Sequence, residues 1–142
     1  MRPFREDEHA AALPAPGGDR PDAPGARGMN LAAIRDLLQC AVLAGGESLD
    51  IEVDTVVAAD GMSAVLAAPH PGALMITGLS NIQSVRTADV AFISAIVYVR
   101  GTRPNETAIE FARKKKIVLL STALGMFDTC GILRDQGLKG AT

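Results

Sequence analysis

The feature that most constrains the fold is a series of short runs that are apolar on both faces. Three of them lie in the second half of the chain: "ALMITG" at 73–78, "ISAIVYV" at 93–99 and "IVLLS" at 117–121. They are rich in aliphatic and β-branched residues, and segments with helical spacing separate them. Strands that are apolar on both faces and joined by helical crossovers predict a parallel sheet covered by helices, with right-handed connections.

The rest of the pattern predicts the remaining elements. Asn30 can cap a helix that runs to about Gln39, because apolar residues recur there at helical spacing. Further strands are expected at 40–43 and 51–60, and helices at 63–68, 80–90, 104–116 and from Thr122 or Ala123 to Gln136. The predicted fold class is α/β: a small, largely parallel sheet of about five strands with helices on both faces.

Residues 1–28 differ in composition from the rest of the chain. They hold five of the eight prolines and four glycines, and they show no apolar periodicity. Such a segment cannot bury enough apolar surface to offset its ordering entropy, so we predict a disordered tail at 1–28 and one domain at 29–142. Translation starting at Met29 is a hypothesis, which mass spectrometry of the native N-terminus would test.

Charge and composition argue against several classes of partner. The net charge is −2 and the pI is about 5.6, whereas nucleic-acid binders usually carry a basic face. No apolar run approaches the ~20 residues that span a bilayer, and the first 28 residues lack the apolar region of a signal peptide. Cys40 and Cys130 are far apart, so we expect half-buried thiols, no metal site and a cytoplasmic location.

Ligands of parallel sheets bind outside the carboxyl ends of the strands. Three such ends are legible here, and each is expected to begin a helix whose free N–H groups could hold an anion or a nucleotide phosphate. The candidate ligand-binding residues are Thr77, Gly78, Ser80, Asn81, Gly101, Thr102, Arg103, Ser121 and Thr122. The alternative interpretation is that Ser, Thr and Asn are ordinary helix caps and that the glycines only permit tight turns.

Motifs for phosphate chemistry and catalysis are missing. There is no GxxxxGK[ST] and no GxGxxG, which argues against nucleotide turnover. His70 lies between two prolines and is expected to be a solvated loop residue. Asp60 is either the cap of a short helix or a polar group at a pocket or interface. No catalytic residue and no cofactor are therefore expected.

From Met29 onward the chain resembles the DRTGG domain, a small α/β module. The residues that carry the resemblance are Gly45-Gly46, Leu49-Asp50, Asp60 to Ser63, Thr77-Gly78, Pro104, Ala112, Ser121-Thr122, Phe127 and Gly131. The namesake motif itself departs from the family pattern. Asp50 is in place, but Ile51 stands where arginine is usual, and Asp54-Thr55-Val56 replaces the Thr-Gly-Gly region. A ligand-binding or interface role of that turn in relatives would then be changed here.

The resemblance implies a regulatory or assembly module rather than an enzyme. Such domains occur inside phosphate acetyltransferases and between nucleotide-sensing domains of some pyrophosphatases, and they resemble the amino-terminal domain of HPr kinase. Free-standing copies are similar to proteins encoded with iron-only hydrogenases in anaerobic bacteria. We therefore expect a non-catalytic module that forms a homodimer or docks on a larger metabolic or redox enzyme.

Two further hypotheses stay open. One is a small-molecule sensor that binds a nucleotide or another phosphate-containing anion at the three strand ends. The other, ranked last, is an enzyme that would use Asp60 or His70 in a transfer reaction.

Overall fold

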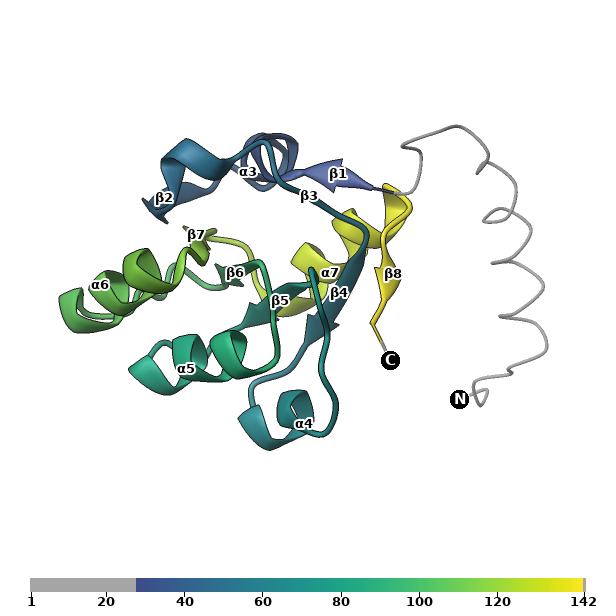
Figure 1. Ribbon diagram of the computed structural model, residues 1–142. Helices are drawn as coiled ribbons and strands as arrows, with labels where there is room; N and C mark the ends of the chain where they lie inside the picture. The colour runs from purple at the N-terminus through teal and green to yellow at the C-terminus, as the bar shows by residue number, and fades with distance from the viewer. Residues whose placement is uncertain (1–27, 142) are drawn as a thin grey trace.

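The computed structural model describes residues 28–141. The predicted tail at 1–28 therefore lies outside the described residues, except for Gly28. The described part is an α/β domain with one six-stranded sheet in the order β2-β7-β6-β5-β4-β8 (Figure 1). These strands are β2 (Ala41–Ala44), β4 (Thr55–Ala58), β5 (Leu74–Thr77), β6 (Ala95–Tyr98), β7 (Val118–Ser121) and β8 (Lys139–Gly140).

The sheet is mostly parallel, as predicted. Strands β4, β5, β6 and β7 run parallel to one another, and β8 adds in parallel to the outer side of β4. Only β2 is antiparallel, where it pairs with β7 at the opposite edge. A separate two-stranded pair joins β1 (Met29–Asn30) to β3 (Glu52–Val53).

Helices cover both faces of the sheet, also as predicted (Figure 1). One face packs against α4 (Met62–Leu66), α5 (Ile82–Val90) and α6 (Glu106–Lys115), and the other against α3 (Leu31–Leu38) and α7 (Met126–Asp135). A short 3-10 helix, η2, spans Gly46–Ser48. Successive strand residues alternate between two apolar clusters: Met75 enters the first, while Leu74 and Ile76 enter the second. All three are fully buried, which explains why the runs are apolar without a break.

Several predicted boundaries were wrong. The run 51–60 forms two strands in different sheets, because it breaks at Asp54. The last helix begins at Met126, not at Thr122 or Ala123. Residues 122–124 are instead bound to the end of β6: Gly101 N donates to Thr122 O (2.8 Å) and Arg100 N to Leu124 O (2.7 Å). Because these bonds fix residues 122–124 in a non-helical conformation, α7 begins about one turn later than predicted.

Candidate functional site

Four parallel strands end at the same edge of the sheet, and their following residues meet there. These are Asp60 after β4, Thr77 and Gly78 at the end of β5, Arg100 and Gly101 after β6, and Ser121 and Thr122 at the end of β7. The sequence predicted this gathering for Thr77, Gly78, Gly101, Ser121 and Thr122, but not for Asp60 or Arg100.

Asp60 binds the end of the neighbouring strand rather than its own helix. Its Oδ1 accepts hydrogen bonds from Gly78 N (2.7 Å) and from Thr77 Oγ1 (3.4 Å). The helix α4 that follows Asp60 has Gly61 at its N-cap position, with no side-chain cap bond. Asp60 is therefore not the cap of α4 but joins two strand ends, and its role at a pocket or interface stays a prediction. Thr77 Oγ1 in turn accepts from Leu79 N (3.0 Å).

Arg100 is a site residue that sequence reasoning missed. Its guanidinium lies directly over Gly78, where an added Cβ would fall on Nη2 and within 3.0 Å of Cζ. Arg100 itself has a left-handed backbone (φ 58) and an exposed side chain. Gly78 thus lies between a carboxylate and a guanidinium. The available signal was the position of Arg100, directly after the buried run that ends in Tyr98-Val99.

The hydroxyl groups of the other two strand ends bind backbone carbonyls. Thr102 Oγ1 donates to Val99 O (2.9 Å), and Ser121 Oγ donates to Thr102 O (2.9 Å). Thr122 Oγ1 donates to Leu38 O (2.7 Å), which joins β7 to the end of α3. In this arrangement the three hydroxyls stabilise the loops of the strand-end edge.

The predicted helix starts at two of these loops carry asparagine caps. Asn81 Oδ1 accepts from Gln83 N (3.0 Å) at α5, and Asn105 Oδ1 accepts from Ala108 N (2.9 Å) at α6. Ser80 precedes the first cap, and the exposed Arg103 precedes the second. Within residues 28–141, neither Arg100 nor Arg103 takes part in an ion pair.

His70 was wrongly expected to be solvated. It is 5% exposed, and its Nε2 lies 3.2 Å from Val65 O. His70 N also donates to Ala91 O, so two neighbouring loops are joined at this residue. The two thiols are half-buried, as expected. Burial raises the pKa of Cys40 to about 11 and also raises that of Cys130, which makes both poor nucleophiles at neutral pH.

The turn that replaces the namesake motif packs into the fold. Ile51 lies partly buried against the cluster beneath α3, and its carbonyl accepts from Leu31 N (2.9 Å). Asp50 beside it is exposed. The side chain of Ile51 therefore packs against the core instead of reaching into solvent.

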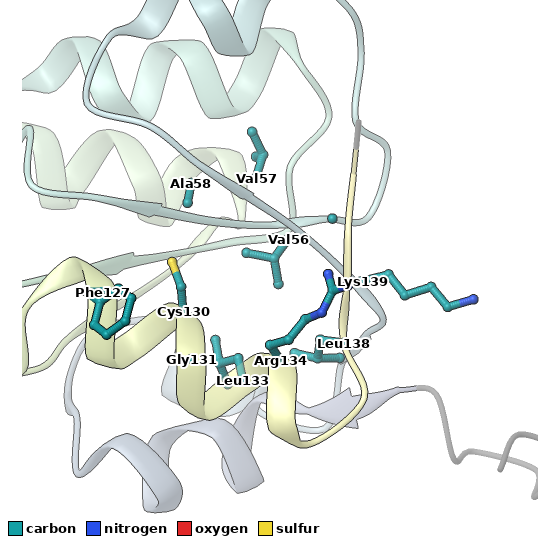
Figure 2. A pocket seen from close by; sticks show the side chains of 11 residues that line it. Val56, Val57, Ala58, Phe127, Cys130, Gly131, Leu133, Arg134, Leu138 and Lys139 are labelled. Carbon is teal, nitrogen blue, oxygen red and sulfur yellow. The ribbon is translucent and has the colours of Figure 1, made fainter. Parts of the chain in front are cut away.

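A second candidate site is a hollow of about 500 Å³ between β4, α7 and β8 (Figure 2). Its lining is mostly apolar or small, with two cationic side chains at one end. The lining residues are Val56, Val57, Ala58, Phe127, Cys130, Gly131, Leu133, Arg134, Leu138, Lys139 and Gly140. Figure 2 shows Val56 and Cys130 directed into the hollow, whereas Val57 points to the other face and Lys139 points away. No pattern in the sequence indicated this hollow, because its walls come from three separate segments.

Phe127 forms the rim of this hollow. Its side chain is 88% exposed, the largest exposed fraction among the large apolar side chains described. Phe127, Cys130, Gly131 and Arg134 follow one another at i, i+3, i+4 and i+7, so they share one face of α7. A Cβ added at Gly131 would have nothing within 4 Å, so no packing inside the molecule requires a glycine there.

The described part of the chain holds neither a cluster of metal-ligating side chains nor a membrane-spanning helix. Among residues 28–141, no group of three or more His, Cys, Asp or Glu side chains could hold a metal ion. No helix in the described range is long and apolar enough to cross a bilayer.

The DRTGG domain profile matches residues 33–135, which is most of the chain. The protein therefore belongs to the DRTGG domain family, as the residue pattern predicted. No curated protein matches the sequence significantly.

A solved structure shares the fold: the regulatory region of Clostridium perfringens pyrophosphatase, with its CBS and DRTGG domains, complexed with the activator diadenosine tetraphosphate. The TM-score is 0.65 and the sequence identity is 21%, and the match covers 80% of this chain. This chain spans 48% of that one, so about half of the regulatory region has no counterpart in the match.

Proposed function

We propose that this protein is a non-catalytic regulatory or assembly module of the cytoplasm that acts by binding another polypeptide. The bound polypeptide is a second copy of the chain or a larger metabolic or redox enzyme, such as an iron-only hydrogenase. Membership of the DRTGG family and the shared fold of a pyrophosphatase regulatory region support the class. The observation that carries the proposal is Phe127, held in water at the rim of an apolar hollow.

The energetics favour a docking role for that surface. Moving a phenylalanine side chain out of water contributes roughly 1.5–3 kcal/mol. Buried aromatic side chains are frequent hot spots of protein interfaces. In this chain Phe127 contributes nothing comparable to its own core, because almost all of its surface remains exposed. A partner that covers Phe127 and fills the hollow recovers that free energy.

Photo-crosslinking in the cells that produce the chain tests the proposal. A benzophenone amino acid replaces Phe127 in one variant and Phe92 in the control. Phe92 is also an exposed phenylalanine (66%), but it lies in the loop before β6. We expect a discrete crosslinked polypeptide from position 127 and none from position 92. Absence of any crosslinked polypeptide from position 127 would contradict the proposal.

A second candidate function is a sensor for a phosphate-containing anion at the strand-end edge. The specific observation in its favour is the guanidinium of Arg100 against Gly78, with Arg103 exposed nearby in the chain. An anion at this edge would meet the two cations, whereas the hydroxyls of Ser121 and Thr122 are buried and already donate to backbone carbonyls. Against it, Asp60 already accepts from the Gly78 N–H, so an anion would compete with this carboxylate.

A thermal-shift panel on the full chain tests the sensor. The ligands are phosphate, AMP, ADP, ATP, acetyl phosphate and diadenosine tetraphosphate. A ligand at 100 times its dissociation constant adds about 2.7 kcal/mol of stability. Arg100→Ala and Arg103→Ala should each weaken such binding by roughly 1.5–3 kcal/mol, the range for a charged hydrogen bond. Arg134→Ala, far from this edge, is the matched control. If no compound shifts the midpoint at millimolar concentration, the sensor is excluded.

A further inference from the structure

The outer surface of α5 and α6 carries an excess of positive charge. The two helices pack side by side on one face of the sheet (Figure 1). Five exposed cationic residues form a basic patch there: Arg86, Arg113, Lys114, Lys115 and Lys116. Two acidic residues, Asp89 and Glu110, lie among them. The patch is therefore positive, although the chain as a whole has a net charge of −2.

Phe111 brings together cations from both helices. The Cζ of Arg86, on α5, lies 6.0 Å from the centroid of the Phe111 ring, and the Nζ of Lys115, on α6, lies 5.6 Å from it. The ring is partly buried against the first apolar cluster, so the core fixes its position. Attraction between a cation and an aromatic ring thus keeps two like charges near each other although they repel.

The helix dipole explains only part of this patch. Cations in the last turn of a helix stabilise it, and Arg113, Lys114 and Lys115 lie in the last turn of α6. Arg86 lies in the middle of α5, where this interaction is absent. The position of Arg86 beside Lys115 is therefore not explained by helix stability, whereas an anion bound from outside would stabilise both charges.

We propose that the basic patch binds an acidic segment of a partner polypeptide, with carboxylates against Arg86 on α5 and against Lys114 and Lys115 on α6. Hydrogen bonds between such ions are stronger than neutral ones, and a guanidinium can bind both oxygens of one carboxylate. This inference goes beyond the proposed function, because α5 and α6 cover the opposite face of the sheet from α7.

The acidic residues within the patch select the kind of partner. Asp89 Oδ2 lies 3.6 Å from Lys115 Nζ, and Glu110 Oε1 lies 3.2 Å from Arg113 Nη1. A nucleic-acid backbone or an anionic bilayer presents a continuous array of negative charge, which would set phosphates against these two carboxylates. A polypeptide can place neutral side chains opposite the carboxylates and acidic ones opposite the cations.

Fluorescence anisotropy of the full chain tests the proposal. The probe is a labelled peptide in which glutamate and glycine alternate, and its control has glutamine in place of each glutamate. We expect a dissociation constant of roughly 10–1000 μM at low ionic strength, weakening as salt is added. The glutamine peptide should not bind. No binding of the glutamate peptide at about 1 mM, or equal binding of both peptides, overturns the proposal.

Three substitutions locate the site, and circular dichroism shows that each variant is folded. Arg86→Glu should weaken binding about tenfold, because it places like charges in contact. Arg35→Glu makes the same change in net charge on α3, at the other face of the sheet, and should change affinity by less than about twofold. Phe111→Leu keeps the charge but removes the ring, so binding should weaken by about two- to fivefold. Equal losses in the two arginine variants, or unchanged binding of Phe111→Leu, overturn the proposed geometry.

The same measurement decides between partners. Single-stranded DNA and phosphatidylserine vesicles should bind more weakly than the acidic peptide. Tighter binding of either, lost in Arg86→Glu, overturns the assignment to a polypeptide. Phe127→Ala should bind the acidic peptide like the unmodified chain. If the peptide binds but position 127 gives no crosslinked polypeptide, the proposed function fails and this inference stands, and the reverse pair of results has the reverse meaning.

Discussion

At the scale of single residues, Asp60 joins two adjacent strand ends through one carboxylate oxygen. Replacing it with alanine removes the acceptor of Gly78 N and Thr77 Oγ1. Since water can partly replace it at this exposed site, we expect Asp60→Ala to lower the free energy of unfolding by about 1 kcal/mol. Asp60→Asn keeps an acceptor oxygen and should lose less. Urea denaturation would measure both.

Asp50→Ala serves as the control for this prediction, because Asp50 is also exposed and also follows a short element. Its removal should change the unfolding free energy by less than about 0.5 kcal/mol, as for an ordinary surface substitution. If Asp50→Ala and Asp60→Ala lowered the free energy of unfolding equally, the contact of Asp60 with Gly78 would make no specific contribution to stability.

Tyr98 makes the protein sensitive to alkaline pH. It is the only tyrosine, it is fully buried, and its hydroxyl lies 2.7 Å from Ser84 Oγ. Burial raises its pKa from 10.0 to about 12, and the bond to Ser84 offsets part of that rise. The contribution to stability is therefore complete below pH 10 and is lost as the pH rises toward 12.

The phenolate absorbance reports on this residue directly, because no other tyrosine is present. We expect the phenolate to appear in the native protein only at strongly alkaline pH, together with unfolding. In urea it should appear near pH 10, the ordinary value for tyrosine. If the Tyr98 phenolate of the native protein formed near pH 10, water would have access to the tyrosine ring.

At the scale of elements, two helices end on residues that adopt an unusual backbone. Gln39 closes α3 with φ 54, and Lys116 closes α6 with φ 61. Glycine adopts this left-handed conformation without a steric cost, whereas other residues lose roughly 1 kcal/mol. We expect Gln39→Gly to raise the free energy of unfolding by about 0.5–1 kcal/mol in urea denaturation.

Gln39→Ala is the matched control, because it removes the same side chain and keeps the steric cost. Its stability should stay close to that of the unmodified chain. If both variants gain equally, the glutamine side chain rather than the backbone would be responsible.

The long elements were predictable because each has a local signal. Asn30, Asn81 and Asn105 cap three helices, and all three caps bind the expected backbone N–H groups. The elements and boundaries that the sequence did not predict have a common physical cause, because they depend on partners distant in the chain. β8 is two residues long and exists through the bond from Lys139 N to Asp54 O. The late start of α7 depends on Arg100 and Gly101, over twenty positions upstream.

At the scale of the whole molecule, stability should decline from the centre of the sheet to its edges. Strand β6 lies between β5 and β7, and its residues are fully buried between the two apolar clusters. Strand β8 is short, exposed and at an edge. We expect amide hydrogen exchange, followed by NMR, to be slowest in β5 and β6 and fastest in β8. Protection of β8 equal to that of β6 in dilute protein would contradict this gradient.

The two candidate sites differ in how far the sequence predicts them. The meeting of the ends of β5, β6 and β7 at one edge follows from the parallel topology, whereas the contact of Asp60 with Thr77 and Gly78 was not predicted. Ligand binding at that edge stays a prediction. Arg100 was missed because its contact with Gly78 depends on side-chain direction. The hollow was missed because it exists only when β4, α7 and β8 come together.

The described chain begins and ends beside one residue. A Cβ added at Gly28 would lie 3.8 Å from the Cβ of Asp54, and Lys139 N donates a hydrogen bond to Asp54 O. The ribbon of Figure 1 shows β1 and β8 at the two ends of the described chain. A domain whose two ends lie close together can be inserted into a surface turn of another protein without separating the residues that flank the insertion. The same property allows circular permutation.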